Sequence, residues 1–479
     1  MSELKEKTAK GLLWGGLGNG MMQVLNLVFG IFLSRLLSPA DYGIVGALTI
    51  FSALAGIFSE SGFILAIVNK KEVSDDDYNA VFWFNVAMSL TIYILLWLSA
   101  PLIARFYNQP EMIRLSRFIF LGFVASALSA TPTAYFFRNL EVKIRSSIQI
   151  LALGVSGTGG VIAAFAGLGY WAIAIQTVLY TFCNSGFLWL RCPWRPNFSF
   201  KPDVLKTLLP FSLKQLVVSL FTQFNNNIFS VLLGRFYGMK VTGFYTQGNK
   251  WTAMGYGTLV GMLTGVGQPV LRQTIGDIER LHRVFRKLLR FTCLVSFPAM
   301  FGLAIVSHEV IVLLITDKWL PSVRVMQILC IGGAFLPIGT LFGNLFNSTG
   351  RPGVYMWNVI TLGCVQTISL CVTYGYGLTV MLIVYSCINI LWIGIWQIQA
   401  HNKIGLGYLQ MLGDILPYLF IAGTTMGVTT WATCALDGLW LKLGLRILLG
   451  GGIYAGAIRV LMPSDYFEAM EFITKRHSR

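Results

Sequence analysis

Charged residues are scarce in this sequence of 479 residues. Asp, Glu, Lys and Arg make up 12% of the chain and hydrophobic residues 55%, whereas a soluble domain usually holds about 25% charged residues. A globule in water cannot bury so much apolar surface, so a soluble fold is excluded. We therefore expect an all-α polytopic membrane protein, because helices satisfy their own backbone hydrogen bonds in lipid.

Metal-binding and redox residues are also few. The four histidines are scattered, and the eight cysteines form no C-x-x-C pair and lie in apolar segments, apart from Cys192. This pattern predicts no metal site, no cofactor and no disulfide framework. P-loop and G-x-G-x-x-G motifs with the correct flanks are missing, which argues against ATP hydrolysis. No long loop is present that could hold a soluble catalytic domain, so we do not expect an enzyme.

One acidic cluster, SDDDY at Ser74–Tyr78, could be taken for the metal-binding acids of a glycosyltransferase. We favour a simpler interpretation, in which Ser74 caps a helix and the three aspartates lie at the positive end of its dipole.

The apolar runs are long and numerous. At about 20 residues per span, hydropathy predicts fourteen transmembrane helices. Their approximate limits are 11–34, 42–66, 79–103, 116–137, 147–168, 170–190, 209–234, 240–269, 288–315, 323–346, 354–374, 377–399, 411–435 and 440–462. Tight hairpins are expected at Gly167–Gly169 and Gly375–Gly377. The first apolar run lacks a small-residue cleavage pattern, which indicates a span and not a signal peptide.

The net charge of +16 has a topological explanation. Most Lys and Arg residues lie in the segments that share a side with the N-terminus, and the positive-inside rule then places both termini in the cytoplasm. The basic charge also suits anionic membrane lipids. We expect no nucleic-acid partner.

Two halves of the chain resemble each other. Ala9–Gly30 matches Leu205–Asn226 at an offset of 196, Arg35–Gly43 matches Arg235–Gly243 at 200, and Pro101–Phe118 matches Glu309–Met326 at 208. We therefore predict an N-terminal lobe of six helices at 1–190, a cytoplasmic linker at 191–208, a C-terminal lobe at 209–399, and two further helices with a cytoplasmic tail at 400–479. Transporters built from repeats place the substrate between them, so a central cavity is expected.

Polar residues recur at helical spacing on the helix that opens each lobe. In the second lobe they are Ser212, Gln215, Ser219, Thr222 and Asn226, and in the first they are Gly16, Asn19, Gln23, Asn26 and Gly30. These faces could pack helix against helix or line a wet cavity, and we favour the cavity. The consecutive Asn225, Asn226 and Asn227 point about 100° apart, so at least one should pack against a neighbouring helix.

Among the charged residues within predicted spans, three bear on function. Lys250 is roughly 15 Å deep, with Gln247 one turn before it, and an ammonium there needs water, a partner or an anionic ligand. Lys214 lies closer to the inner surface. Glu60 could neutralise a lysine, carry a coupling proton or sodium ion, or cap a helix break at Gly62.

Four stretches of the chain together resemble a known family. They are Lys10–Gly46, Val73–Asn85, Leu232–Trp251 and Pro298–Trp319. The chain is similar over essentially its whole length to the lipopolysaccharide and exopolysaccharide flippases of the multidrug/oligosaccharidyl-lipid/polysaccharide exporter superfamily. The family often carries an acidic residue in helix 7 where this chain has Asn225–Asn227, and this departure argues against carboxylate-based ion coupling there.

The resemblance implies two six-helix lobes plus two terminal helices, alternating access, and a polyprenyl-pyrophosphate-linked oligosaccharide flipped to the outer leaflet of a bacterial inner membrane. Expected partners are that substrate, membrane lipids, the polysaccharide polymerase or export machinery, and H⁺ or Na⁺ as coupling ion. The candidate substrate-binding residues are Lys250, Gln247, Lys214, Gln215, Ser219, Thr222, Asn226, Asn19, Gln23 and Asn26, with Glu60 for ion coupling. Alternatives are efflux of organic cations, a membrane glycosyltransferase or polymerase, and a scramblase or scaffold.

Overall fold

The structure, a computed structural model, describes residues 2–60, 67, 70, 73–197, 202–464 and 466–467. For residues 2–13, 54–56, 58–60, 202–215, 218 and 266 it describes the backbone only. This part of the chain is helical without strands, so the predicted all-α fold is confirmed. Eleven of its helical segments are long and apolar enough to cross a membrane. The predicted spans 209–234 and 240–269, and the described part of 42–66, coincide with helices outside that set, so the count of fourteen stays a prediction.

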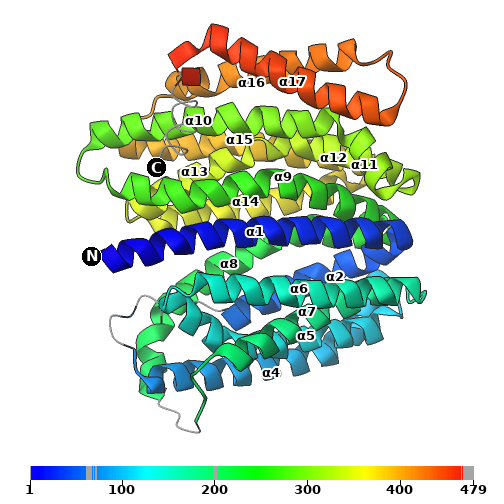
Figure 1. Cartoon of the computed structure of the whole chain (residues 1–479), viewed down its shortest axis with the longest axis vertical. Helices are drawn as coiled ribbons and strands as arrows, with labels where there is room; N and C mark the ends of the chain where they lie inside the picture. The colour runs from blue at the N-terminus through cyan, green and yellow to red at the C-terminus, as the bar shows by residue number, and fades with distance from the viewer. Residues whose placement is uncertain are drawn as a thin grey trace. The chain divides into compact units, whose positions relative to one another are not determined.

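Two compact units make up the chain, Met1–Gly243 and Phe244–Arg479. The first holds α1 (Ser2–Leu36), α2 (Pro39–Glu60), α4 (Asp75–Tyr107), α5 (Met112–Arg138), α6 (Val142–Phe165), α7 (Tyr170–Arg191), α8 (Pro202–Phe236) and the first turn of α9 (Met239–Arg272). The second continues α9 and adds α10 (Ile278–Ile305), α11 (Ser307–Ile315), η1 (Asp317–Trp319), α12 (Leu320–Gly333), α13 (Leu336–Ser348), α14 (Pro352–Thr373), η2 (Tyr374–Tyr376), α15 (Leu378–Ile404), α16 (Tyr408–Ala432) and α17 (Leu439–Leu461) (Figure 1).

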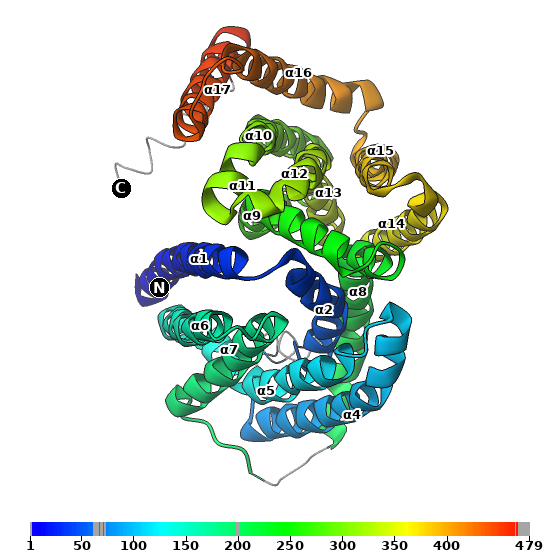
Figure 2. The same ribbon diagram turned by 90° about the vertical axis from the view of Figure 1, so that its right-hand side faces the viewer.

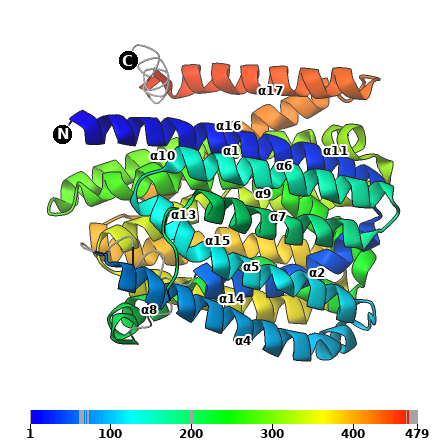
Figure 3. The same cartoon turned by 60° about the horizontal axis from the view of Figure 1, so that its bottom comes forward.

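In the first unit, α4, α5, α7 and α6 lie side by side with their axes roughly aligned (Figure 3), and α1 packs on α6. Helix α8 packs on α2 and α4. An aromatic cluster of Tyr78, Phe82, Trp189 and Trp194 joins one end of α4 to the end of α7. The predicted lobes with a linker at 191–208 stay a prediction.

The acidic cluster at the start of α4 is a helix cap, as predicted. The Asp77 carboxylate accepts the backbone N–H of Ser74 at 2.9 Å and is 1% exposed. Lys70 donates to both Asp77 oxygens, at 2.6 and 2.7 Å. The carboxylate is therefore committed to the helix start and to one lysine, with no sign of a metal-binding arrangement among the described residues.

Two predicted spans of the second unit have different limits in the structure. The span at 288–315 begins ten residues earlier, at Ile278, and is interrupted between α10 and α11. Its first turns carry several arginines, and hydropathy excluded them although the helix continues. The span at 323–346 consists of two helices, α12 and α13, because the first helix ends shortly before Pro337.

The C-terminal helices α16 and α17 are attached to α10 and α11 at three levels, beside one another in Figures 1 and 2. Arg286 of α10 donates to Asp414 of α16 at 2.6 and 3.0 Å. Near the middle, the Tyr454 hydroxyl of α17 donates to the Leu294 carbonyl at 2.9 Å. At the other end Arg446 of α17 reaches Glu309 of α11.

Helix limits support the internal repeat. Helices α1 and α8 end at Leu36 and Phe236, and α2 and α9 begin at Pro39 and Met239. The predicted hairpins are confirmed too: Gly169 and Gly377 have positive φ and each precedes a helix.

The structure corrects the register of the first repeated helix. Its limits coincide in α1 and α8 at an offset of 200, whereas the sequence comparison used 196, one helical turn less. At 200, Gln23 is equivalent to Gln223 and Asn26 to Asn226. The two helices thus carry the same pair of amides at the same place.

Helices α2 and α9 cross in close contact at two glycines, Gly43 and Gly243. A Cβ atom on Gly43 would overlap the Met239 carbonyl, and one on Gly243 would overlap the Pro39 carbonyl. Only a residue without a side chain lets the two backbones come so close.

Candidate functional site: polar faces on membrane helices

Helix α1 presents three different faces. One packs on α6: a Cβ on Gly18 would meet the Ser146 side chain at 2.6 Å. A second is apolar and exposed. It consists of Leu17, Met21, Val24 and Val28. At 100° per residue, the third lies roughly opposite the second and carries the predicted polar residues.

The amides on that third face are exposed. Asn19, Gln23 and Asn26 all lie at the surface and not in a helix–helix interface. Packing was the alternative interpretation of this stripe, and such amides would then be buried. An amide facing hydrocarbon without a hydrogen-bond partner costs on the order of 2–7 kcal/mol. An exposed row of three amides on a membrane helix therefore favours the cavity interpretation of this stripe, which stays a prediction.

The matching face of α8 is partly described. Asn226 is exposed and donates to the Gln223 side chain at 3.4 Å, while Ser219 and Thr222 are half-buried. The side chains of Lys214 and Gln215 lie outside the described residues. Because α1 packs on α6 and α8 packs on α2 and α4, the two polar faces are carried by separately packed helices.

The three consecutive asparagines have three different environments. Asn225 is 8% exposed and Asn226 is exposed. Asn227 donates to the Gln223 carbonyl at 2.9 Å and accepts from the Thr49 hydroxyl of α2 at 3.1 Å. The prediction that at least one of them packs against a neighbouring helix is confirmed, and Asn226 is the one left at the surface.

On α9, Gln247 and Lys250 differ in burial. Gln247 is 1% exposed, so it belongs to the interior of the second unit. Lys250 is half-buried and forms no hydrogen bond or ion pair with any residue that the structure describes. It lies eleven residues after Met239, roughly 16 Å along the helix. A cation at this position needs water or an anionic group, because burying it alone costs several kcal/mol.

The side chain of Glu60, the candidate for ion coupling, lies outside the described residues. Its three suggested roles stay predictions.

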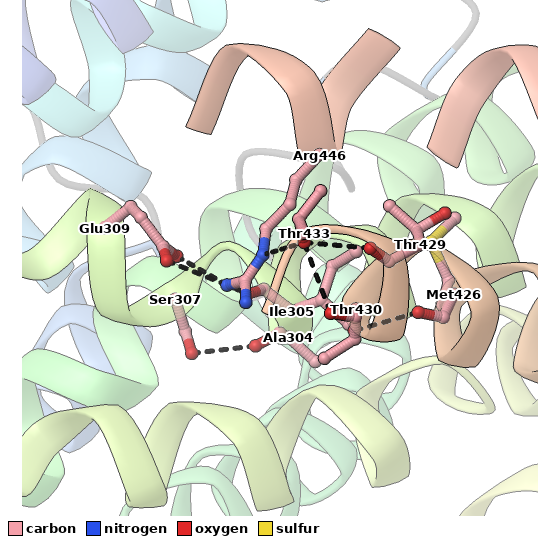
Figure 4. A network of polar contacts seen from close by, with 9 residues as sticks. All are labelled: Ala304, Ile305, Ser307, Glu309, Met426, Thr429, Thr430, Thr433 and Arg446. Atoms are coloured by element: carbon pink, nitrogen blue, oxygen red, sulfur yellow. Dashed lines mark hydrogen bonds and ion pairs between the residues drawn. The ribbon is translucent and has the colours of Figure 1, made fainter. Parts of the chain in front are cut away.

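Sequence reasoning missed a buried ion pair in the second unit (Figure 4). Arg446 Nη1 lies 2.8 Å from both carboxylate oxygens of Glu309 and 2.6 Å from the Ile305 carbonyl, and Arg446 Nε donates to the Thr433 hydroxyl at 3.1 Å. Glu309 is 1% exposed and Arg446 is 9% exposed. Arg446 lies two turns inside α17, within the predicted span 440–462. The signal available was Glu309, an acid within an otherwise apolar run.

Amide pairs also join α14 to α15. Gln366 donates to Asn389 at 3.1 Å, and Asn358 donates to Gln399. Gln366 and Asn358 are each 2% exposed, so these pairs serve helix packing.

Comparison with solved structures defines the class of fold. The lipid II flippase MurJ, in an inward closed conformation, is similar with a TM-score of 0.77 and 13% identity over 94% of this chain and 98% of that one. An inward-facing multidrug resistance MATE transporter is similar with a TM-score of 0.68 and 16% identity, over 80% of this chain and 94% of that one. The fold is that of the multi-pass transporters of this exporter superfamily, as expected.

The sequence defines the family within that class. The model of the family described as "Polysaccharide biosynthesis protein" matches residues 32–324, and the chain belongs to this family. The lipopolysaccharide biosynthesis protein WzxC of Escherichia coli K12 is 26% identical over 74% of this chain and 73% of its own length. The teichuronic acid biosynthesis protein TuaB of Bacillus subtilis 168 is 24% identical over 96% of this chain and 95% of its own.

Proposed function

We propose that this protein moves a polyprenyl-pyrophosphate-linked oligosaccharide across a bacterial inner membrane by alternating access. The observation that carries the proposal is the exposed amide face of α1, with Asn19, Gln23 and Asn26 opposite an apolar face. A glycan offers many hydroxyl groups, and amides both donate to and accept from hydroxyls. Membership of a polysaccharide biosynthesis family supports the same substrate class.

Lys250 supplies the complementary charge for the carrier. It is a half-buried cation without a partner among the described residues, and an ammonium acts as a point charge for phosphate. The same charge would repel an organic cation, which makes multidrug efflux the weaker candidate despite the MATE-like fold.

The remaining parts of the proposal follow from the class of protein. A transporter of this kind needs a driving force, and we expect H⁺ or Na⁺ coupling with both termini in the cytoplasm. It performs no chemistry on the glycan. A polymerase or export system would take the oligosaccharide at the outer face.

The test in cells is deletion of the gene, followed by mass spectrometry of lipid-linked oligosaccharides and labelling with a membrane-impermeant glycan reagent. We expect the oligosaccharide to accumulate in a form that the label cannot reach, and wild-type protein to reverse the effect. Unchanged lipid-linked oligosaccharide together with altered sensitivity to cationic drugs would replace the proposal with efflux.

A further inference from the structure

A pocket of about 530 Å³ lies beside the buried ion pair of the second unit. It is formed by the end of α10 with α11, α12, α16 and α17. Its polar lining residues are His308, Glu309, Gln327, Thr430, Lys442 and Arg446. Ala304, Ile305 and Ile331 provide the apolar part. The pocket is thus amphipathic, with polar groups from four helices converging on one space.

The guanidinium of Arg446 is only partly used by the protein. Nη1 contacts Glu309 and the Ile305 carbonyl, and Nε contacts Thr433. Nη2 forms no hydrogen bond within the described part of the chain, although the residue is nine-tenths buried and lines the pocket. A guanidinium carries five N–H donors, so two remain for a ligand.

Charge in the pocket is positive after this pairing. Glu309 is neutralised by Arg446, since Nη1 lies 2.8 Å from both of its oxygens. The ammonium of Lys442, one turn before Arg446 on α17, has no ion-pair or hydrogen-bond partner among the residues described. Exposed His308 adds a ring that can donate a hydrogen bond. These groups suit an anion with several oxygen acceptors.

Two tryptophans indicate the depth of the pocket in the membrane. Trp431 follows the lining residue Thr430 and is 78% exposed, and Trp440 stands two residues before Lys442 and is 70% exposed. Exposed tryptophans on membrane helices gather at the level of the lipid headgroups. The pocket beside them therefore lies at the level of the phosphate groups of membrane lipids.

We propose that this pocket binds the phosphate group of an anionic lipid, with Arg446 Nη2 and Lys442 as the cationic contacts and the apolar residues against the lipid's first carbons. The two sources of such a group are bulk phospholipid and a polyprenyl phosphate. This site is separate from the amide face of α1, and it stands whether or not the protein is a flippase.

Binding is measured on the purified full chain by native mass spectrometry with phosphatidylglycerol, and in parallel with a polyprenyl monophosphate. Loss of one interfacial cation weakens binding by about fivefold, so Lys442→Gln should lower the retention of both lipids by that factor. Lys442→Arg should retain binding. Gln327→Lys, which adds a cation to the pocket lining from α12, should raise it.

The matched control is Lys240→Gln, an exposed lysine of α9 that does not line the pocket. It should leave retention of both lipids unchanged. Tighter binding of one of the two lipids would support the proposal and identify the source. Equal retention by wild type and Lys442→Gln, with Gln327→Lys also unchanged, would overturn it. Stabilisation by inorganic phosphate alone, to the same extent as by the lipids, would overturn the assignment to a lipid.

Discussion

Gly43 and Gly243 lie against each other at the crossing of α2 and α9, and their numbers differ by the repeat offset of 200. A Cβ on Gly43 would come within 3.0 Å of the Gly243 nitrogen, and one on Gly243 within 3.2 Å of the Gly43 nitrogen. The Cβ on Gly43 would also overlap the Met239 carbonyl, and the Cβ on Gly243 would overlap the Pro39 carbonyl. Pro39 and Met239 are themselves 200 residues apart. The contact is therefore symmetric, because equivalent residues of the two repeats contact each other here.

This contact predicts that Gly43→Ala lowers stability. The added methyl group meets backbone atoms, which cannot rotate away, so we expect a loss of about 1–3 kcal/mol or more. Thermal unfolding in detergent is the measurement. Gly16→Ala is the control, because a Cβ on Gly16 meets no atom within 4 Å. Equal unfolding temperatures for the two variants would show that the helices do not cross so closely.

The exposed amides of α1 predict a separation of function from stability. Gln23→Leu and Asn26→Leu should reduce transport while the unfolding free energy stays within roughly 0.5 kcal/mol, as for ordinary surface substitutions. The control is Val24→Leu on the apolar face, which should change neither property. Transport is followed as the amount of label-accessible lipid-linked oligosaccharide in cells. A large fall in stability for Asn26→Leu would mean instead that the amide packs between helices.

How far the sequence predicts this fold depends on the type of residue. Long apolar runs such as those of α6 and α7 gave their helices to within a few residues, because hydrophobicity alone defines a membrane span. Arg286 marked a false end, because hydropathy treats a charge as the edge of a span, whereas Arg446 lies inside the predicted span 440–462. Their partners Asp414 and Glu309 are more than a hundred residues away, and no local pattern reveals such a pair.

The candidate site shows the same limit. Helical spacing predicted the polar stripe of Asn19, Gln23 and Asn26, because the geometry of a helix is regular. Helical spacing does not show which face of α1 packs and which is exposed. The structure shows it, because one face of α1 packs on α6. The predicted register of α1 against α8 was wrong by one turn for a related reason. Apolar helices align almost equally well when shifted by a whole turn. The helix breaks before Pro39 and Met239 fix the offset at 200.

Lys250 should be required for transport and dispensable for folding. Loss of a charge-assisted contact of about 1.5–3 kcal/mol corresponds to a reduction of transport by roughly tenfold or more in Lys250→Ala. Lys250→Arg keeps the charge and should keep most activity. Both are compared at equal membrane abundance by quantitative immunoblotting, with Lys240→Ala as the exposed control on the same helix. Normal transport by Lys250→Ala would remove this lysine from the mechanism.

The Glu309–Arg446 pair should be coupled in a double-mutant cycle. Removing one partner leaves the other charge buried and costs about 3–5 kcal/mol, so Arg446→Met and Glu309→Leu should each unfold at much lower temperature. The double variant should recover most of this loss, since two apolar side chains replace two charges. Additive effects of the single changes would show that the two residues do not interact.

The central claim, that this chain moves a lipid-linked oligosaccharide, is tested most directly with purified protein in proteoliposomes that contain a fluorescent polyprenyl-pyrophosphate-linked oligosaccharide. An impermeant quencher reports the fraction in the outer leaflet over time, under imposed H⁺ or Na⁺ gradients. We predict that wild-type protein moves the labelled lipid between leaflets much faster than empty liposomes and faster than Lys250→Ala. Movement no faster than in empty liposomes under either gradient, with uptake of a cationic dye by the same vesicles, would contradict the account.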